Sequence, residues 1–305
     1  MSALAVRVCA PATTANLGPG FDTLALALDL WNEAEFHLTG QGVHLRIEGE
    51  GASTLPRGAA NLTALAFAHY YQRKGLPEPA GLRIDCLNRI PSGSGLGSSA
   101  AAVIQGLLAA DALSGCGASK EELLALAVEL EGHGDNAAAA LFGGLTVALQ
   151  LPDRWVVRRF DVPPLRAALV LPDVDLPTSV ARKALPGAVP RADAIFNSSR
   201  TPLVVEALRT GDLDLLGQVM DDRLHQPYRL PLIRGAAEAM TAARQAGAAA
   251  AALSGAGPSL IAFCRGESQP VADAMRAAFE QAGVAARAFT LTATSRAAEV
   301  EKIAA

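Results

Sequence analysis

Apolar and polar positions alternate along much of the first half of the chain, as they do in half-buried strands. The spacing becomes helical in three places. One helical segment ends at Gly75, a typical helix C-terminal cap, and another begins at Ser119, which fits a capping box with Glu122. The pattern therefore predicts a loop over 11–21, strands over 4–10, 23–30, 33–38, 43–48, 81–87, 143–151 and 154–160, and helices over 62–74, 97–113 and 119–131.

The pair Pro163-Pro164 is the best candidate for a domain boundary, which divides the chain into residues 1–162 and 163–305. Beyond it, two strands, a helix and a strand follow a helix, which is the order of a split βαβ or ferredoxin-like half. The predicted class is α+β in two layers. The second domain is expected to hold strands over 166–171, 248–254, 259–264 and 285–291, and helices over 178–184, 191–210, 212–224, 232–246 and 269–282.

Composition and charge narrow the possible classes of protein. Half of the 305 residues are hydrophobic and 18% are charged, below the roughly 25% usual in soluble domains, which excludes a disordered chain. The net charge of −4 gives no global basic field, so we expect neither nucleic acid nor a membrane surface as a partner. Any anionic ligand would have to be held by local groups.

The cysteines and the apolar runs predict a soluble protein in a reducing, cytoplasmic compartment. The four cysteines form no C-x-x-C pair and have no zinc-site spacing. Residues 1–10 lack the basic region of a signal peptide. The longest uncharged stretch, 246–264, contains a glycine-rich turn that a membrane-spanning helix would not tolerate well.

A glycine-rich loop between a predicted strand and a predicted helix is the strongest local feature. Its glycines would allow close backbone approach to a ligand, and its N–H groups with the helix N-terminus would form an anion site. A Walker A loop is excluded because Ser98 stands where lysine is required, and the G-x-G-x-G spacing does not fit the dinucleotide or protein-kinase patterns. The alternative is an ordinary strand–helix turn. The loop consists of Pro91, Ser92, Gly93, Ser94, Gly95, Leu96, Gly97, Ser98 and Ser99.

Two further segments, 10–22 and 254–259, are small, polar and rich in turn residues, and each lies between apolar strands. Either of them alone would more often be a hairpin connection. Three such loops in one acidic chain favour a polyanion held by backbone groups rather than by lysines. A serine hydroxyl directly after a phosphate loop can also ligate Mg²⁺.

In this order, the three segments resemble the signature motifs of the GHMP kinases, and segment 10–22 resembles the homoserine kinase family within them. The resemblance implies a ribosomal-protein-S5-like N-terminal domain and a ferredoxin-like C-terminal domain. It also implies a homodimer and transfer of the ATP γ-phosphoryl group to the hydroxyl of homoserine, giving O-phospho-L-homoserine for threonine biosynthesis. ATP and Mg²⁺ are the expected co-substrate and cofactor.

For ATP, the resemblance implies that the loop 91–99 wraps the triphosphate and that Asn61 lies near the adenosine. It assigns Mg²⁺ to the Ser99 hydroxyl and the Glu131 carboxylate, which are hard oxygen ligands of the kind that Mg²⁺ prefers. Without the resemblance, Glu131 would be a solvated residue at the end of a helix.

For the acceptor, the resemblance assigns the carboxylate of homoserine to Arg182 and Arg229, whose planar guanidinium groups suit that contact. It assigns the ammonium group to Asp22. Asp135 is a candidate base or an orienting residue. Without the resemblance, both arginines would be interpreted as surface ion pairs. The pocket near the hydroxyl is expected to be lined by Asn16, His133, Asp135 and Thr178.

The chain departs from the pattern at Gly134, where many relatives carry proline, and this leaves the turn before Asp135 less stiff. Two alternatives to a homoserine kinase remain at this point. An isoprenoid-pathway or sugar kinase of the same fold would need no amino-acid clamp at Arg182 and Arg229. A non-catalytic sensor of nucleotide or metabolite would bind without turnover, although Ser99, Glu131 and Asp135 argue against it.

Overall fold

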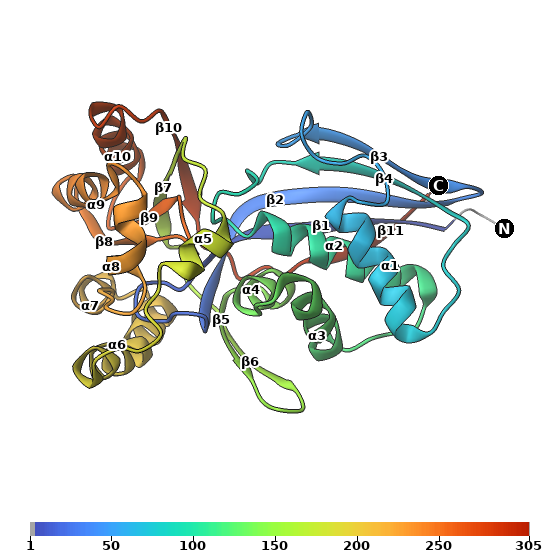
Figure 1. The fold of residues 1–305 in the computed structure, drawn as a ribbon, viewed down its shortest axis with the longest axis horizontal. Coiled ribbons are helices and arrows are strands. Elements are labelled where there is room, and N and C mark those ends of the chain that lie inside the picture. Colours follow the sequence, from blue (N-terminus) through green and yellow to red (C-terminus); the bar gives the residue numbers. More distant parts are fainter. Residues whose placement is uncertain (1–3, 305) are drawn as a thin grey trace.

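Two sheets, each packed against helices, form two lobes that lie side by side (Figure 1). In the computed structural model, which describes residues 4–304, the larger sheet has the strand order β11-β1-β2-β4-β3, with β5 on β2 and β6 on β5. Its neighbours are antiparallel except for β3 and β4. The strands are β1 (Leu4–Ala15), β2 (Leu24–Thr39), β3 (Gly42–Gly49), β4 (Gly81–Asn88), β5 (Leu145–Gln150), β6 (Trp155–Phe160) and β11 (Glu299–Ala304).

Four helices cover one face of this sheet (Figure 1). Helix α2 is apolar almost all round because it lies between the sheet and its neighbouring helices, and Val103, Ile104 and Leu107 are fully buried there. Gly75 ends α1 in the left-handed conformation, and the capping box of Ser119 and Glu122 begins α3, as predicted. The helices are α1 (Leu62–Lys74), α2 (Ser98–Ser114), α3 (Lys120–Glu131) and α4 (Asp135–Phe142).

The smaller sheet has the order β10-β7-β9-β8 with antiparallel neighbours, in agreement with the predicted ferredoxin-like half. Helices α9 and α10 cover one face, and α6 and α7 supply apolar side chains to the core on the other. Its elements are β7 (Arg166–Pro172), α5 (Thr178–Lys183), α6 (Arg191–Thr210), α7 (Leu213–Val219), α8 (Gln226–Arg229), a 3₁₀ turn (Leu230–Leu232), α9 (Ala236–Gln245), β8 (Ala248–Leu253), β9 (Leu260–Cys264), α10 (Gln269–Gln281) and β10 (Ala286–Thr292).

Several predicted boundaries were wrong. Strand β1 does not end before a loop at Pro11 but continues to Ala15, because a register shift between Pro11 and Ala12 keeps it paired with β2. The same irregularity bends β2, whose sequence therefore looked like two strands. The helix predicted over 212–224 ends at Val219, and the one predicted over 232–246 is divided where Gly235, with φ +88°, begins α9.

Helix α4 and strand β11 were not predicted at all. The short, alanine-rich α4 offers no alternating pattern. Strand β11 is polar and mostly exposed, yet it leaves the second lobe and pairs with β1 in the first sheet. No helix formed by residues 4–304 is both long enough and apolar enough to cross a lipid bilayer.

Candidate active site

A cavity of about 440 Å³ lies where the two lobes meet, and the three glycine-rich segments all reach it. Pro91 and Leu96 do not line it, because both are buried beneath the loop, and Glu131 reaches it only through Ser99. The other candidate residues all line it: Asn16, Asp22, Asn61, Ser92, Gly93, Ser94, Gly95, Gly97, Ser98, Ser99, His133, Asp135, Thr178, Arg182 and Arg229.

The three glycines of the loop have different roles. All have positive φ, at +65°, +78° and +66° for Gly93, Gly95 and Gly97. A Cβ at Gly95 would lie 2.3 Å from the carbonyl oxygen of Ser254, and one at Gly97 would lie 1.9 Å from Oγ1 of Thr13. A Cβ at Gly93 would meet nothing within 4 Å. Gly95 and Gly97 therefore serve the packing of the loops on one another, and Gly93 is the one that faces open space.

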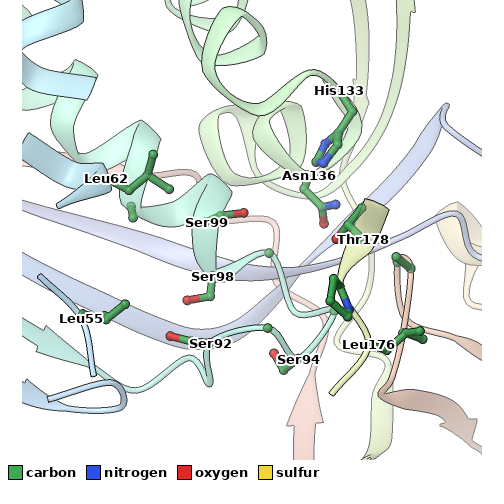
Figure 2. A pocket seen from close by; sticks show the side chains of 18 of the residues that line it. Leu55, Leu62, Ser92, Ser94, Ser98, Ser99, His133, Asn136, Leu176 and Thr178 are labelled. Carbon is green, nitrogen blue, oxygen red and sulfur yellow. The ribbon is translucent and has the colours of Figure 1, made fainter. Parts of the chain in front are cut away.

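Hydrogen bonds join the three segments into one unit. The backbone N–H of Thr13 donates to the carbonyl of Leu96 at 3.0 Å. The Ser254 hydroxyl bridges Oγ1 of Thr14 at 2.9 Å and the carbonyl of Gly95 at 2.7 Å. The loop is thereby held with the N-terminus of α2, marked by Ser98 in Figure 2, directed at the cavity. This arrangement suits a polyphosphate, since unpaired N–H groups and the helix dipole both favour negative charge.

Ser99 and Glu131 are in direct contact, although they are far apart in the sequence. Oγ of Ser99 donates to Oε2 of Glu131 at 2.7 Å. Burial raises the pKa of Glu131 above its ordinary value, while the Ser99 hydrogen bond acts in the opposite direction. Residues 4–304 contain no cluster of three or more His, Cys, Asp or Glu side chains that could form an all-protein metal cage. Two hard oxygen donors beside a loop that suits a polyphosphate fit Mg²⁺, which usually keeps several waters and phosphate ligands.

At the other end of the loop, Leu55 and Leu62 give the cavity an apolar side (Figure 2). Asn61 caps α1: its Oδ1 accepts from the N–H of Thr63, and its Nδ2 donates to the carbonyl of Pro56, both at 2.9 Å. The side chain of Asn61 thus holds the wall of the cavity in place.

Sequence reasoning missed Asn32, which is 2% exposed and lines the cavity. Its Oδ1 accepts from the N–H groups of Arg89 at 2.8 Å and Ile90 at 2.9 Å, and so fixes the chain where it enters the glycine loop. An isolated asparagine between two apparent strands carried no signal, because the bulge that turns it inward is set by pairing with β1.

The predicted acceptor residues gather at the opposite end of the cavity, where His133, Asn136 and Thr178 are close to one another (Figure 2). Nδ1 of His133 lies 3.4 Å from Oδ1 of Asp135, and the Asp135 carboxylate raises the pKa of His133. The buried Asp135 carboxylate also accepts from the N–H of Asn136 at 2.7 Å. Asn136, a residue not predicted, accepts at its Oδ1 from the Thr13 hydroxyl at 2.7 Å.

The two arginines are in different states. Arg182 makes a two-pronged ion pair with Asp22, with both N–O distances 2.9 Å, which the sequence did not predict. Arg229 is 1% exposed and has no ion-pair partner among residues 4–304; its Nε donates to the carbonyl of Ala181 at 3.3 Å. Burial lowers the pKa of Arg229. Its guanidinium also lies over the ring of Phe21, 5.0 Å from the centroid. A buried guanidinium with no carboxylate partner is costly unless an anion joins it.

The comparisons with known proteins agree with this geometry. Residues 59–144 match the GHMP kinases N terminal domain, and residues 204–281 match the GHMP kinases C terminal domain. The homoserine kinase of Moorella thermoacetica is 46% identical over 280 residues, which are 92% of this chain and 93% of the relative. The chain belongs to the homoserine kinase family. It is therefore an ATP-dependent kinase with the GHMP kinase fold.

Solved homoserine kinases share the architecture over nearly the whole chain. The homoserine kinase of Cytophaga hutchinsonii is 30% identical, with a TM-score of 0.86 over 97% of each chain. Mevalonate kinase from L. major is 19% identical, with a TM-score of 0.72 over 95% of this chain, and shares the fold.

Proposed function

We propose that this homoserine kinase family member transfers the γ-phosphoryl group of ATP to the side-chain hydroxyl of L-homoserine within this cavity, giving O-phospho-L-homoserine. One observation carries the proposal: a phosphate-binding loop and a pair of arginines with an aspartate open into the same cavity. A carboxylate clamp and an ammonium partner are what an amino-acid acceptor requires, and a sugar or isoprenoid acceptor does not.

At the ATP end, loop 91–99 holds the triphosphate through its N–H groups and the N-terminus of α2. Asn61 lies toward the nucleoside, on the side of Leu55 and Leu62. Ser99 and Glu131 hold Mg²⁺, which when bound neutralises charge on the phosphates. These groups supply positioning and electrostatic stabilisation, which account for most of the catalysis in phosphoryl transfer.

At the acceptor end, the zwitterion of homoserine separates the ion pair between Asp22 and Arg182. Its carboxylate binds Arg182 and Arg229, and its ammonium group binds Asp22. The incoming zwitterion replaces one pair with two, and it also gives the buried Arg229 an anionic partner. Asn16, His133, Asp135 and Thr178 surround the hydroxyl.

In the reaction, the hydroxyl oxygen of homoserine bonds to the γ-phosphorus as the bond from this phosphorus to the β–γ bridging oxygen breaks. ADP leaves, and the hydroxyl proton is released to Asp135 or to solvent. Asp135 is the candidate base because it is buried beside the acceptor end, within 3.4 Å of His133. Its role is distinguished by Asp135→Asn: a loss of rate of only a few-fold would rule out an essential base and leave an orienting role.

The test of the function is release of ADP from ATP and Mg²⁺ with a panel of acceptors: homoserine, threonine, mevalonate, galactose and a cytidyl isoprenoid precursor. We expect homoserine to be the preferred acceptor. Turnover of mevalonate or galactose without turnover of homoserine would contradict the proposal, and nucleotide binding without any turnover would indicate a sensor. If the natural acceptor were a sugar or an isoprenoid precursor without a carboxylate to bind, Arg182→Ala and Arg229→Ala would leave the KM for that acceptor unchanged.

Three further points rest on the sequence: the domain boundary on Pro163-Pro164, the location on the cysteines, and the homodimer on the family resemblance. We propose domains over 1–162 and 163–305, with β11 added to the first sheet. We also propose a homodimer, which light scattering would test by a mass twice the 31.4 kDa of the chain. A cytoplasmic location would be tested by fractionation of the source cells.

A further inference from the structure

The turn over residues 16–22, which carries Asp22 into the acceptor end of the cavity, has an unusual backbone. Asn16, Leu17 and Asp22 have φ of +69°, +47° and +53°. Side-chain-bearing residues rarely adopt this left-handed conformation, and they keep it only when their surroundings hold it. The contacts that hold this turn are therefore part of the acceptor site.

His225, from the second lobe, holds the middle of the turn. It is fully buried, and its Nε2 lies 2.8 Å from the carbonyl oxygen of Gly18. Its ring stacks on that of Phe21, with centroids 5.2 Å apart and planes 21° apart. At Gly18 the turn also packs directly on the second lobe, because a Cβ there would lie 2.0 Å from the carbonyl oxygen of Met220.

Helix α6 holds the next residue of the turn. The carbonyl of Pro19 accepts from Nδ2 of Asn197 at 3.2 Å, and it shares the hydroxyl of Thr201, 3.0 Å away, with the carbonyl of Asn197 at 2.9 Å. The two consecutive carbonyls at 18 and 19 are thus fixed by side chains that belong to α6 and to the segment before α8.

Asp222 ties these holding side chains to Arg229. Its Oδ1 accepts from Nδ2 of Asn197 at 2.7 Å, and its Oδ2 accepts from the N–H groups of His225 at 3.0 Å and Gln226 at 2.7 Å. These N–H groups begin the short helix α8, which ends at Arg229. The same network therefore sets the position of the turn and that of the buried arginine.

We infer that His225, Asn197 and Asp222 are positioning residues for the acceptor site. Together they fix the turn that carries Asp22 relative to the helix that carries Arg229. None of the three lines the cavity, so they act through Asp22 and Arg229. The inference rests on the proposed function for its kinetic readout. It predicts that damage to the network weakens use of homoserine and leaves the use of ATP unchanged.

His225 acts as a neutral donor. Burial lowers its pKa, and the carbonyl of Gly18 requires the tautomer with the proton on Nε2. Its Nδ1, the acceptor nitrogen in this tautomer, is buried and has no hydrogen-bond donor among residues 4–304. A glutamine at this position can place an amide N–H near the same carbonyl, whereas a leucine keeps bulk and loses the donor.

The kinetic experiment compares His225→Leu, His225→Gln and the wild-type chain. We expect His225→Leu to raise the KM for homoserine about tenfold, the value of one hydrogen bond at the upper end of its usual range, with the KM for ATP within twofold. His225→Gln should recover most of the loss. Tyr70→Phe is the matched control, because it removes a buried hydrogen bond of 2.6 Å to Asp111 in the other lobe and should change neither KM. Equal rises in both KM values, or no rise for homoserine, would overturn the inference.

Amide hydrogen exchange over residues 16–24 tests the same contacts without substrate. His225→Leu should speed exchange there, and Tyr70→Phe should not. If the wild-type chain does not phosphorylate homoserine, the proposed function fails, and exchange still decides whether His225 holds the turn. If His225→Leu does not fold, Thr201→Val removes one hydrogen bond to Pro19 at nearly constant volume. Thr201→Val should speed amide exchange over residues 16–24 and raise the KM for homoserine, each by about threefold. An unchanged exchange rate or an unchanged KM would overturn the inference.

Discussion

Two turns line one cavity, and both use the left-handed backbone conformation in different ways. The glycine loop places glycine at each of its positions with positive φ, at 93, 95 and 97, so its shape is compatible with its own sequence. The turn over 16–22 places Asn16, Leu17 and Asp22 in the same conformation and depends on side chains of the second lobe. The glycine loop thus has a sequence that allows its backbone conformation, and Ser254 of the second lobe holds it in place, whereas the turn over 16–22 keeps an unfavourable conformation through contacts with the second lobe.

The largest expected effect concerns stability in the glycine loop. Gly95→Ala should lower the free energy of unfolding by about 2–5 kcal/mol, the sum of left-handed strain and a clash with the Ser254 carbonyl 2.3 Å away. Gly93→Ala has the same strain but meets open space, so it should cost only about 1–2 kcal/mol. Chemical denaturation of both variants measures the difference. Equal losses would mean that strain alone determines the cost and that the packing of the loops contributes nothing.

This difference between the turns also explains how much could be predicted from the sequence. Gly93, Gly95 and Gly97 formed a visible spacing, so the loop between β4 and α2, and helix α2 itself, were predicted correctly. The backbone of the turn over 16–22 could not be predicted, because Leu17 prefers other conformations and what holds it lies about 200 residues further along the chain.

The candidate residues of the acceptor end were assigned from the family resemblance, and their pairing was not foreseen. Nothing local indicates that Asp22 contacts Arg182, or that Arg229 is buried without a carboxylate, since both facts depend on how the lobes meet. Asn32 was missed because the bulge that turns it inward depends on the pairing of β2 with β1. Local pattern predicted most of the elements, although not α4 or β11, and long-range packing determined which polar side chains turn inward.

At the acceptor end, Arg229→Met should lower kcat/KM for homoserine by about 10²- to 10⁴-fold. Two charge-assisted hydrogen bonds to the acceptor carboxylate, each worth about 1.5–3 kcal/mol, would be lost, and tenfold in rate corresponds to about 1.4 kcal/mol. The KM for ATP should stay within twofold. Folding should not be weakened much, because methionine fills the space of a buried charge that has backbone carbonyls and the Phe21 ring as partners but no carboxylate. Steady-state kinetics with each substrate varied in turn checks the split, and a parallel loss for ATP would show that the two ends are not separable.

Glu131→Gln tests whether the proposed metal ligand Glu131 lowers the free energy of unfolding when no metal is bound. Burial raises the folded-state pKa of Glu131, so the folded state holds the proton more tightly than the unfolded state. The ionised Glu131 carboxylate therefore lowers the stability of the fold as pH rises. This loss begins near the pKa of the unfolded state and is complete above the raised pKa of the folded state. Without Mg²⁺, Glu131→Gln should raise the denaturation midpoint at pH 7.5, and this gain should vanish as pH falls below the unfolded pKa.

The same variant should need about tenfold more Mg²⁺, or still more, for half-maximal rate, as expected when a metal site loses a group that supports it. Thr63→Val, a change beside Asn61 on the same cavity wall, serves as the control and should leave the Mg²⁺ requirement unchanged. A Mg²⁺ requirement unchanged in Glu131→Gln would remove Glu131 from the proposed metal site.

The smallest expected effect concerns the ion pair between Asp22 and Arg182. Their side chains are 40% and 38% exposed, so the pair should contribute no more than about 1 kcal/mol to the free energy of unfolding, and less in high salt. A double-mutant cycle with Asp22→Asn and Arg182→Gln, measured without ligand, gives this coupling directly. Each single variant should still weaken homoserine binding strongly, because each removes a partner of the zwitterion. A coupling above about 2 kcal/mol would mean that the exposed pair, rather than the buried contacts of His225 and Asn197, holds the turn in its left-handed conformation.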